Sequence, residues 1–177
     1  SAAADRQAAH AEIKEIAGRY VRVRSAATLL QWAIDRYRRE KQGPLLKRAG
    51  QLFATLTSGS FSSLQLEFDE QDHAHLAGLR PDGSKTGVGG MTSGTVDQLY
   101  LALRVASVED FLERASPLPF VADDLFINFD DGRAAAGLAI LGQLAQKTQV
   151  LFFTHHQHLV EIARTTLGRS VSVISLL

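Results

Sequence analysis

The sequence predicts an α/β domain with a parallel sheet, preceded by a long helix of the coiled-coil type. Apolar residues in the first part repeat at spacings of three and four, and short apolar runs alternate with helix-length segments in the last part. Helices are the usual connections between parallel strands. With 177 residues, of which 45 % are hydrophobic, the chain can form one domain with an extension.

The first helix carries a heptad pattern, which is typical of a strand of a coiled coil. A helix packed on a globular core is the alternative, although it usually shows a wider apolar stripe. Gly43-Pro44 predicts the end of this helix, because proline suits the first turn of a new one. We therefore expect a heptad helix over residues 1–42 and a separate unit over 43–177. The heptad seam consists of Ile13, Ile16, Tyr20, Val23, Ala27, Leu30, Ile34 and Tyr37.

Beyond this boundary, the changing period of the apolar residues predicts the next elements. Residues 45–56 repeat at helical spacing, and from Phe61 the period becomes two, as in a half-buried strand. A second strand over 75–80 is followed by a Pro-Asp-Gly turn at 81–83. The five glycines of residues 82–94 predict a flexible loop.

The last part of the chain alternates between helices and strands. A helix over 95–115 is expected to bury Leu99, Ala102, Leu103, Ala106 and Phe111. Strand–helix–strand order at these lengths predicts parallel pairing with right-handed crossovers. The remaining predicted elements are strands over 118–123, 149–154 and 170–176, and helices over 132–146 and 157–167.

Composition limits the compartment and the partners. Cysteine is absent, which excludes a disulfide scaffold and favours a reducing cytoplasm. No apolar stretch approaches the roughly 18–20 residues of a membrane span, so we expect no membrane partner. Residues 1–50 hold eleven Lys and Arg against five Asp and Glu, and the remainder holds eight against fourteen. This asymmetry indicates a basic arm for nucleic acid or an acidic partner, or simply a solvated Arg-rich helix.

Chemically useful side chains follow two of the predicted strands. Asp123 and Asp124 end one apolar run, and Thr154-His155 ends the next. Parallel strands present functional side chains at their carboxyl ends. Adjacent carboxylates after an apolar run are costly unless they hold a cation or a water molecule. A helix cap is the alternative for such an aspartate, but Asp130 and Asp131 are better placed to cap the helix at 132.

Thr92, Ser93 and Gly94 precede the helix predicted from residue 95. A helix N-terminus with small hydroxyl residues can bind an anion, whereas the alternative is simple capping by Ser93 or Thr95. The loop is not a Walker A motif, because Thr95-Val96 stands where Lys and Ser or Thr are required. The sequence therefore predicts a turn that can contact a phosphate without enclosing it.

Three histidines, His155, His156 and His158, follow the strand over 149–154. Because consecutive residues at a strand end point in opposite directions, we do not expect the three to converge on one metal ion. A histidine at this position is often a packed, hydrogen-bonded side chain. The location of His155 one strand beyond the carboxylates favours a functional role instead.

Taken together, these motifs resemble the C-terminal lobe of an ABC-type ATPase head of the P-loop NTPase class. The similarity is to the SMC and DNA-repair superfamily, nearest the YhaN-like group of bacterial coiled-coil ATPases. It covers residues of about 45–177, and the heptad helix is similar to the end of the family's returning coiled coil. The matching segments are Met91–Thr95 (signature motif), Phe120–Asp124 (Walker B and the following carboxylate), Asn128–Asp130 (D-loop), His155 (switch histidine) and the helical run Gln98–Arg104.

The resemblance implies ATP and Mg²⁺ as cofactors of the complete head. It implies that Asp124 orients the attacking water, that His155 senses the γ-phosphate and that Asp123 binds Mg²⁺. The other motif residues would contact ATP or the partner head across a dimer interface. These cofactor-binding residues are Thr92, Ser93, Gly94, Asn128 and Asp130.

The sequence departs from the family pattern at three positions. Thr92 replaces the signature Ser but keeps its hydroxyl, and Ser93 replaces the first Gly. Asp124 replaces Glu and is one methylene shorter, which withdraws the carboxylate by about 1.5 Å and implies slow hydrolysis. The family's Walker A motif lies in an N-terminal lobe. ATP hydrolysis is therefore expected only when that lobe is combined with this chain.

The implied partners are the N-terminal ATPase lobe of the parent protein, a second copy of the chain, and DNA through the parent. Two alternatives remain open at the level of sequence. The chain could be a non-enzymatic coiled-coil interaction module. It could also be a hydrolase, since Ser93, Asp123 or Asp124, and His155 occur in the Ser–Asp–His order of α/β-hydrolases, but it lacks the G-x-S-x-G elbow.

Overall fold

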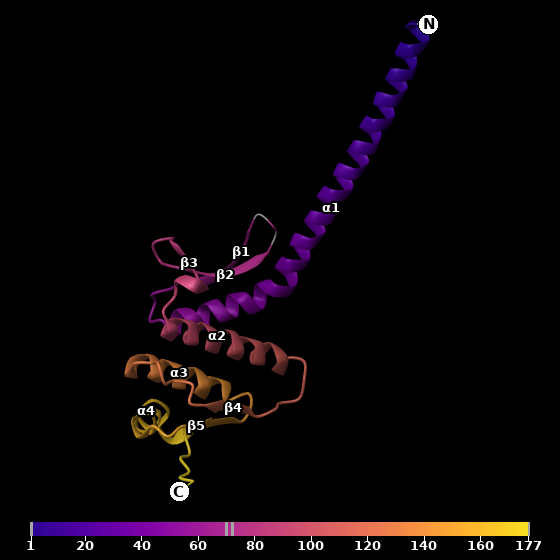
Figure 1. Ribbon diagram of the computed structural model, residues 1–177. Helices are drawn as coiled ribbons and strands as arrows, with labels where there is room; N and C mark the ends of the chain where they lie inside the picture. The colour runs from indigo at the N-terminus through magenta and orange to yellow at the C-terminus, as the bar shows by residue number, and fades with distance from the viewer. Residues whose placement is uncertain (1, 70, 72, 177) are drawn as a thin grey trace. The chain divides into compact units, whose positions relative to one another are not determined.

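The computed structural model describes residues 2–69, 71 and 73–176, and its contacts divide the chain into two compact units (Figure 1). The first unit, residues 1–43, is the helical arm, and the second unit is residues 44–177. The elements are α1 (Ala2–Leu56), β1 (Ser63–Phe68), β2 (Ala74–Leu79), β3 (Lys85–Gly87), a 3₁₀ turn η1 (Val88–Gly90), α2 (Ser93–Leu112), β4 (Phe120–Asp123), α3 (Asp131–Leu144), β5 (Val150–Phe153), α4 (Gln157–Leu167) and a 3₁₀ turn η2 (Gly168–Ser170).

Helix α1 runs through Gly43-Pro44, so the predicted end of the first helix at this point is wrong. Proline in a helix interior removes one backbone hydrogen bond and costs about 3 kcal/mol. The turns after Pro44 offset that cost because Ala49, Leu52 and Phe53 are buried in the core of the second unit. Tertiary packing therefore outweighs the local helix-breaking signal.

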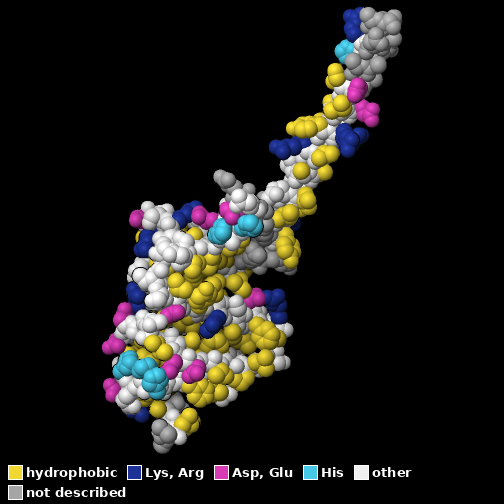
Figure 2. Space-filling model, viewed as in Figure 1, with side chains coloured by type: hydrophobic (Ala, Val, Ile, Leu, Met, Phe, Trp, Pro, Cys, Tyr) yellow, Lys and Arg dark blue, Asp and Glu magenta, His cyan; other side chains and the backbone are white. Residues whose placement is uncertain are grey.

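The seam residues of the arm are exposed, except Ile34, which is half-buried. Ile16 and Val23 are 60 % and 63 % exposed, and hydrophobic side chains (yellow in Figure 2) lie along the arm. An exposed apolar row at heptad spacing is stabilised when a second helix covers it. None of the helices, over its described residues, is both long and apolar enough to cross a membrane.

An antiparallel sheet in the order β1-β2-β3 follows α1. The two predicted strands are confirmed, and they pair with each other in antiparallel fashion, with Leu64 opposite Gly78. The glycine-rich segment 82–94 is not a plain flexible loop, as predicted, because β3 and η1 form within it. The turn at Asp82-Gly83 brings β3 back onto β2: Gly83 has a φ of 85°, and the Asp82 carboxylate accepts a hydrogen bond from the Ser84 amide.

Strands β4 and β5 form a two-stranded parallel sheet, with Ala122 opposite Phe152. The predicted parallel pairing of these strands is thus confirmed, and α3 and α4 lie within a few residues of their predicted bounds. The predicted strand over 170–176 is wrong, because η2 ends at Ser170 and residues 171–176 belong to no strand. A strand requires a hydrogen-bonded neighbour, and apolar alternation alone does not supply one.

The core of the second unit lies between the end of α1 and helices α2, α3 and α4 (Figure 1). Helix α2 buries Leu99, Leu101 and Val105. The predicted buried face is therefore only partly right, since Phe111 is 45 % exposed. Because α2 packs against both the end of α1 and the segment after β4, its buried face is wider than one helical stripe. Phe126, only 1 % exposed, anchors that segment to the core.

Candidate functional site

The site begins at the carboxyl end of β4, where Asp123 is exposed and Asp124 turns the chain sharply. Asp124 has a φ of 44°, a left-handed conformation that few residues other than glycine, Asn and Asp adopt. Its backbone amide donates a hydrogen bond of 3.0 Å to the carbonyl of Phe153 on β5. Non-glycine residues held in this conformation are concentrated at functional sites. The backbone conformation thus directs the Asp124 side chain toward the end of β5.

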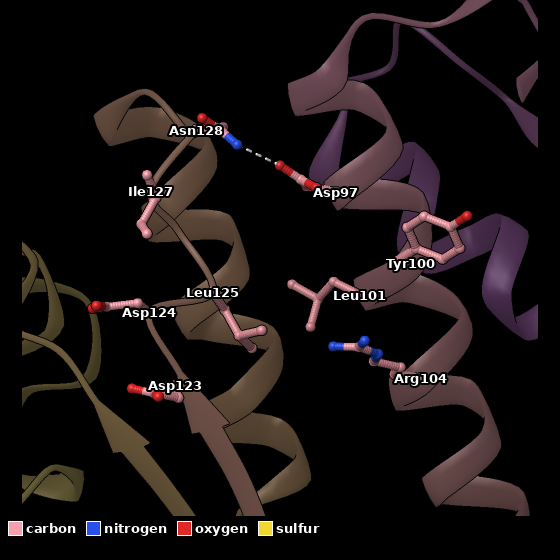
Figure 3. A pocket seen from close by; sticks show the side chains of 9 residues that line it. All are labelled: Asp97, Tyr100, Leu101, Arg104, Asp123, Asp124, Leu125, Ile127 and Asn128. Carbon is pink, nitrogen blue, oxygen red and sulfur yellow. Dashed lines mark hydrogen bonds between the residues drawn. The ribbon is translucent and has the colours of Figure 1, made fainter. Parts of the chain in front are cut away.

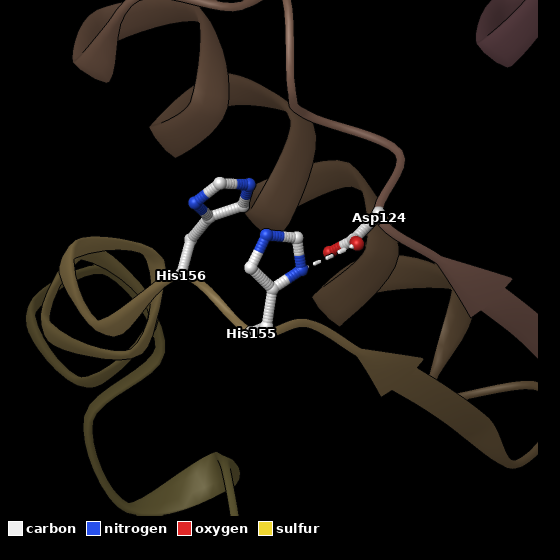
Figure 4. A group of neighbouring side chains, drawn as sticks. All are labelled: Asp124, His155 and His156. Carbon is white, nitrogen blue, oxygen red and sulfur yellow. Dashed lines mark hydrogen bonds and ion pairs between the residues drawn. The ribbon is translucent and has the colours of Figure 1, made fainter.

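The Asp124 side chain contacts His155. Its Nδ1 lies 2.8 Å from Oδ2 of Asp124, whose side chain is 25 % exposed (Figure 4). Desolvation raises the pKa of Asp124, but the Thr154 hydroxyl and the His155 imidazole outweigh it, so the net pKa lies below its ordinary value. An ionised carboxylate only accepts hydrogen bonds, so His155 Nδ1 is the donor and its Nε2 is left for another partner.

His156 joins the same cluster, which the sequence did not indicate. Its ring centroid lies 3.9 Å from that of His155, and its backbone amide donates to the Thr154 hydroxyl. The expected divergence of consecutive histidines fails because β5 ends at Phe153, and the two-residue alternation of side chains holds only within a strand. His158, with its ring 5.5 Å from that of His156, stays outside the cluster, so the three histidines do not converge.

A second group of predicted residues lies at the start of α2. Thr92, rather than Ser93 or Thr95, caps this helix, because its hydroxyl accepts from the Thr95 amide at 3.3 Å. Ser93 is exposed beside it. A Cβ added at Gly94 would lie 3.0 Å from the backbone carbonyl oxygen of Asn128, so glycine allows the helix start to approach the segment after β4.

Asn128 and Asp130 are both held by hydrogen bonds. The amide of the Asn128 side chain donates to Asp97 on α2 at 2.8 Å, which ties the segment after β4 to the start of α2. Asp130 caps α3 by accepting from the Arg133 amide at 2.8 Å, as its position suggested, and it pairs with the Arg133 guanidinium. The Asp130 carboxylate is therefore already occupied within the chain.

An open pocket of about 290 Å³ lies between α2 and residues 123–128. In Figure 3, Leu101 and Arg104 of α2 face Leu125 across it, whereas the carboxylates of Asp123 and Asp124 point away from α2. Asp123 and Asp124 nevertheless belong to the lining of this pocket, so the pocket borders the carboxylate–histidine cluster. We place the candidate site at the cluster, because there the Asp124 carboxylate pairs with the His155 imidazole.

The structure thus brings the predicted residues together in two groups. Asp123, Asp124 and His155 meet at the ends of the parallel strands. Thr92, Ser93, Gly94 and Asn128 meet at the start of α2. No hydrogen bond joins Ser93 to His155 among the described residues, so the hydrolase alternative lacks its nucleophile–base contact.

The sequence is similar to that of one bacterial protein. The chain is 30 % identical over 147 residues to the uncharacterised protein YhaN of Bacillus subtilis, a match covering 82 % of the chain. The sequence is therefore YhaN-like. The chain spans only about 15 % of the length of YhaN. No protein-family profile matches the sequence.

The structural matches are SMC head domains. A chain from work on ATP-driven dimerisation and DNA-stimulated activation of SMC ATPases superposes with a TM-score of 0.58 at 14 % identity, covering 71 % of this chain and 75 % of that one. The Pyrococcus furiosus Smc head, bound to the C-terminal domain of ScpA, gives 0.54 at 14 %, covering 70 % and 30 %. The Thermotoga maritima SMC head gives 0.50 at 20 %, covering 78 % and 45 %. At identities this low, the TM-scores show that the fold is shared with SMC heads, and they show the fold alone.

Proposed function

We propose that this chain is the C-terminal half of an SMC-like ATPase head that hydrolyses ATP at a head–head interface, in DNA repair or chromosome maintenance. The observation that carries the proposal is the Asp124–His155 pair, which a left-handed turn at Asp124 sets at the ends of two parallel strands. Such strand ends are where α/β folds bind ligands. The similarity to YhaN and the fold of SMC heads support the same class.

The residues present fit Mg²⁺ and a phosphate chain in part. Asp123 offers an exposed carboxylate, the ligand type that Mg²⁺ prefers. Ser93 and the exposed Thr92 lie at the start of a 20-residue helix, where amide N–H groups favour an anion. The sequence contains no Walker A motif, so the contacts that would enclose the phosphates are assigned to the N-terminal lobe of the parent.

In the complete head, Mg²⁺ would neutralise charge on the phosphates. Asp123 would hold that ion, directly or through water. Asp124, kept ionised by its neighbours, would orient the attacking water and accept a hydrogen bond from it. His155, fixed through Nδ1 to Asp124, would direct Nε2 toward the γ-phosphate. The shorter aspartate makes slow turnover the expected behaviour.

The other predicted residues would act at the interface between heads. Thr92, Ser93 and Gly94 would contact ATP held by the opposite head, with Asn128 close behind Gly94. Asp130 supports this loop as the cap of α3, and a direct role for it requires release from Arg133. The backbone contact between Gly94 and Asn128 would move these two motifs together when heads associate.

The proposed partners are the N-terminal lobe of the parent, a second copy of the chain and DNA bound through the parent. The free edges of the β4–β5 sheet and exposed side chains such as Val121 and Leu151 offer an apolar surface to the lobe. The exposed seam on α1 suits a coiled-coil partner. We place this assembly in the cytoplasm, consistent with a sequence without cysteine.

Reconstitution tests the proposal. The chain is co-expressed with the N-terminal lobe of its parent, and Mg²⁺-dependent ATP hydrolysis is measured for each half and for the pair. Turnover by the pair alone supports the proposal, and Asp123→Asn should then weaken Mg²⁺-dependent nucleotide binding. A pair that forms but never hydrolyses ATP favours the non-enzymatic coiled-coil module, for which the exposed seam of α1 is the specific observation.

A further inference from the structure

The Asp124–His155–His156 cluster has a feature that the proposed hydrolysis does not use. One ligand atom from each side chain can be chosen so that all three lie within 4.8 Å of one another. In Figure 4 the His155 ring lies next to the Asp124 carboxylate, and the His156 ring lies beyond the His155 ring. This places two nitrogen donors and one oxygen donor in a single cluster.

Two polar atoms in this cluster are shielded from solvent and make no hydrogen bond of normal geometry among the described residues: Oδ1 of Asp124, which has the Thr154 hydroxyl as a neighbour, and Nε2 of His156. A shielded polar atom without a partner is unfavourable, so each such atom requires an explanation. In the tautomer of His156 that carries its proton on Nδ1, Nε2 offers only a lone pair, as an ionised carboxylate oxygen does, so the two atoms cannot satisfy one another. A cation is a partner for both.

We propose that Asp124, His155 and His156 bind a divalent transition-metal ion of the Zn²⁺ class. Two imidazoles and one carboxylate are the ligand types that Zn²⁺ and similar ions prefer, whereas Mg²⁺ and Ca²⁺ prefer oxygen ligands alone. Metal–ligand bonds of about 2.0–2.2 Å hold ligand atoms at most about 4.4 Å apart. The cluster therefore needs only a small side-chain rotation, which the 72 % exposed His155 side chain can make.

The three side chains are also held so that they can act together. Thr154 accepts the His156 amide and fixes the turn that carries both histidines, while the left-handed backbone of Asp124 points its carboxylate at them. Metal binding replaces the Asp124–His155 hydrogen bond: His155 Nδ1 releases its proton to solvent, and the ion then bonds to that nitrogen and to the Asp124 carboxylate.

A second histidine–carboxylate cluster in the chain serves as a comparison. His73 and His75 both contact the same oxygen of Asp69, at 3.2 and 3.1 Å. That carboxylate oxygen is thus already satisfied, and this group does not bring its three ligand atoms as close together as the Asp124 cluster does. A double substitution there removes two imidazoles without touching the proposed site.

The test is a calorimetric titration of the full 177-residue chain with ZnCl₂ in the presence of excess Mg²⁺, repeated with Co²⁺ followed by its visible absorption. We expect one equivalent to bind. We expect His156→Ala and Asp124→Asn each to weaken it about tenfold or more. His158→Ala and the double variant His73→Ala/His75→Ala should leave that affinity unchanged. Circular dichroism confirms that each variant is folded.

Three results would overturn the proposal: no Zn²⁺ binding, displacement of Zn²⁺ by millimolar Mg²⁺, or equal losses in the His73/His75 and His156 variants, which would mean scattered surface histidines. The titration uses no nucleotide, so it is independent of the proposed ATP hydrolysis. If both proposals hold, an ion at this position occupies Asp124 and His155, and Zn²⁺ should inhibit the reconstituted head. That consequence alone rests on the proposed function.

Discussion

Arg48, near the end of α1, forms two hydrogen bonds with Glu109 of α2, at 2.6 and 3.0 Å. Lys147, just beyond α3, contacts the same carboxylate at 3.2 Å. The Glu109 side chain is only 10 % exposed, whereas those of Arg48 and Lys147 are 39 % and 56 % exposed. Within the second unit, one shielded carboxylate therefore connects the end of α1, helix α2 and the turn after α3.

Glu109→Gln should lower the free energy of unfolding by about 1–2 kcal/mol, since bonds to charged groups are strong but both cations are partly screened by solvent. Arg48 lowers the pKa of Glu109 most, against desolvation, and Lys147 lowers it further. A depressed pKa gives stability above the unfolded value of about 4.3, and this stability is lost as the pH falls through the folded value. Urea unfolding should show a constant difference between the two proteins at pH 6–8 that shrinks below about pH 4. A difference unaffected by acid would show that the charge is not responsible.

Gly137 should not tolerate a methyl group. A Cβ there would lie 2.4 Å from the ring of Phe126, which is 1 % exposed. Gly137→Ala should cost about 1–3 kcal/mol by overpacking, despite the better helix propensity of alanine. Gly132→Ala in the same helix is the matched control, because its nearest contact is an ordinary 3.5 Å. Equal unfolding midpoints for the two variants would contradict the packing described for α3.

The arm should mediate self-association through its heptad seam. Ile16→Gln with Val23→Gln removes two seam residues, and Val21→Gln with Leu29→Gln removes two off-seam residues of similar exposure. Light scattering over a range of concentrations should show a weaker dimer for the first variant only. A monomer at high micromolar concentration for the unmodified chain would end this proposal. Equal effects of the two variants would instead assign the dimer to non-specific apolar contact.

The isolated chain should bind Mg²⁺-ATP weakly or not at all, because it has hydroxyls and a helix start for one phosphate but no loop to enclose the others. Calorimetry with the chain alone measures this directly, and the same titration with the reconstituted head is the control. Micromolar affinity of the lone chain would mean that the nucleotide contacts have been assigned to the wrong half.

Much of the second unit could be predicted from periodicity, and the failures share a cause. The β1–β2 hairpin, α3 and α4 have local patterns that agree with their environments. Residues 171–176 alternate like a strand but have no strand to pair with, and α1 continues past Pro44 because packing outweighs local preference. Both outcomes depend on contacts that are distant in sequence, which a local pattern does not contain.

The same distinction applies to the site. The proximity of Asp124 and His155 followed from one rule, that parallel strands end at the same edge. The position of His156 next to His155 could not be predicted from this rule, because it depends on a turn just past the end of β5. The sequence did not predict the left-handed conformation of Asp124 either, although aspartate is among the few residues that adopt it.

The most direct measurement for the proposed ATPase is turnover by the reconstituted head carrying Asp124→Asn. Asparagine also adopts the left-handed conformation, so the φ of 44° should persist and the fold should remain intact. Loss of the water-orienting carboxylate should slow hydrolysis about 10²-fold or more while ATP-dependent association of heads is kept. Asp131→Asn, at the exposed start of α3, is the matched control and should keep normal turnover. Full turnover by the Asp124→Asn head would contradict the account.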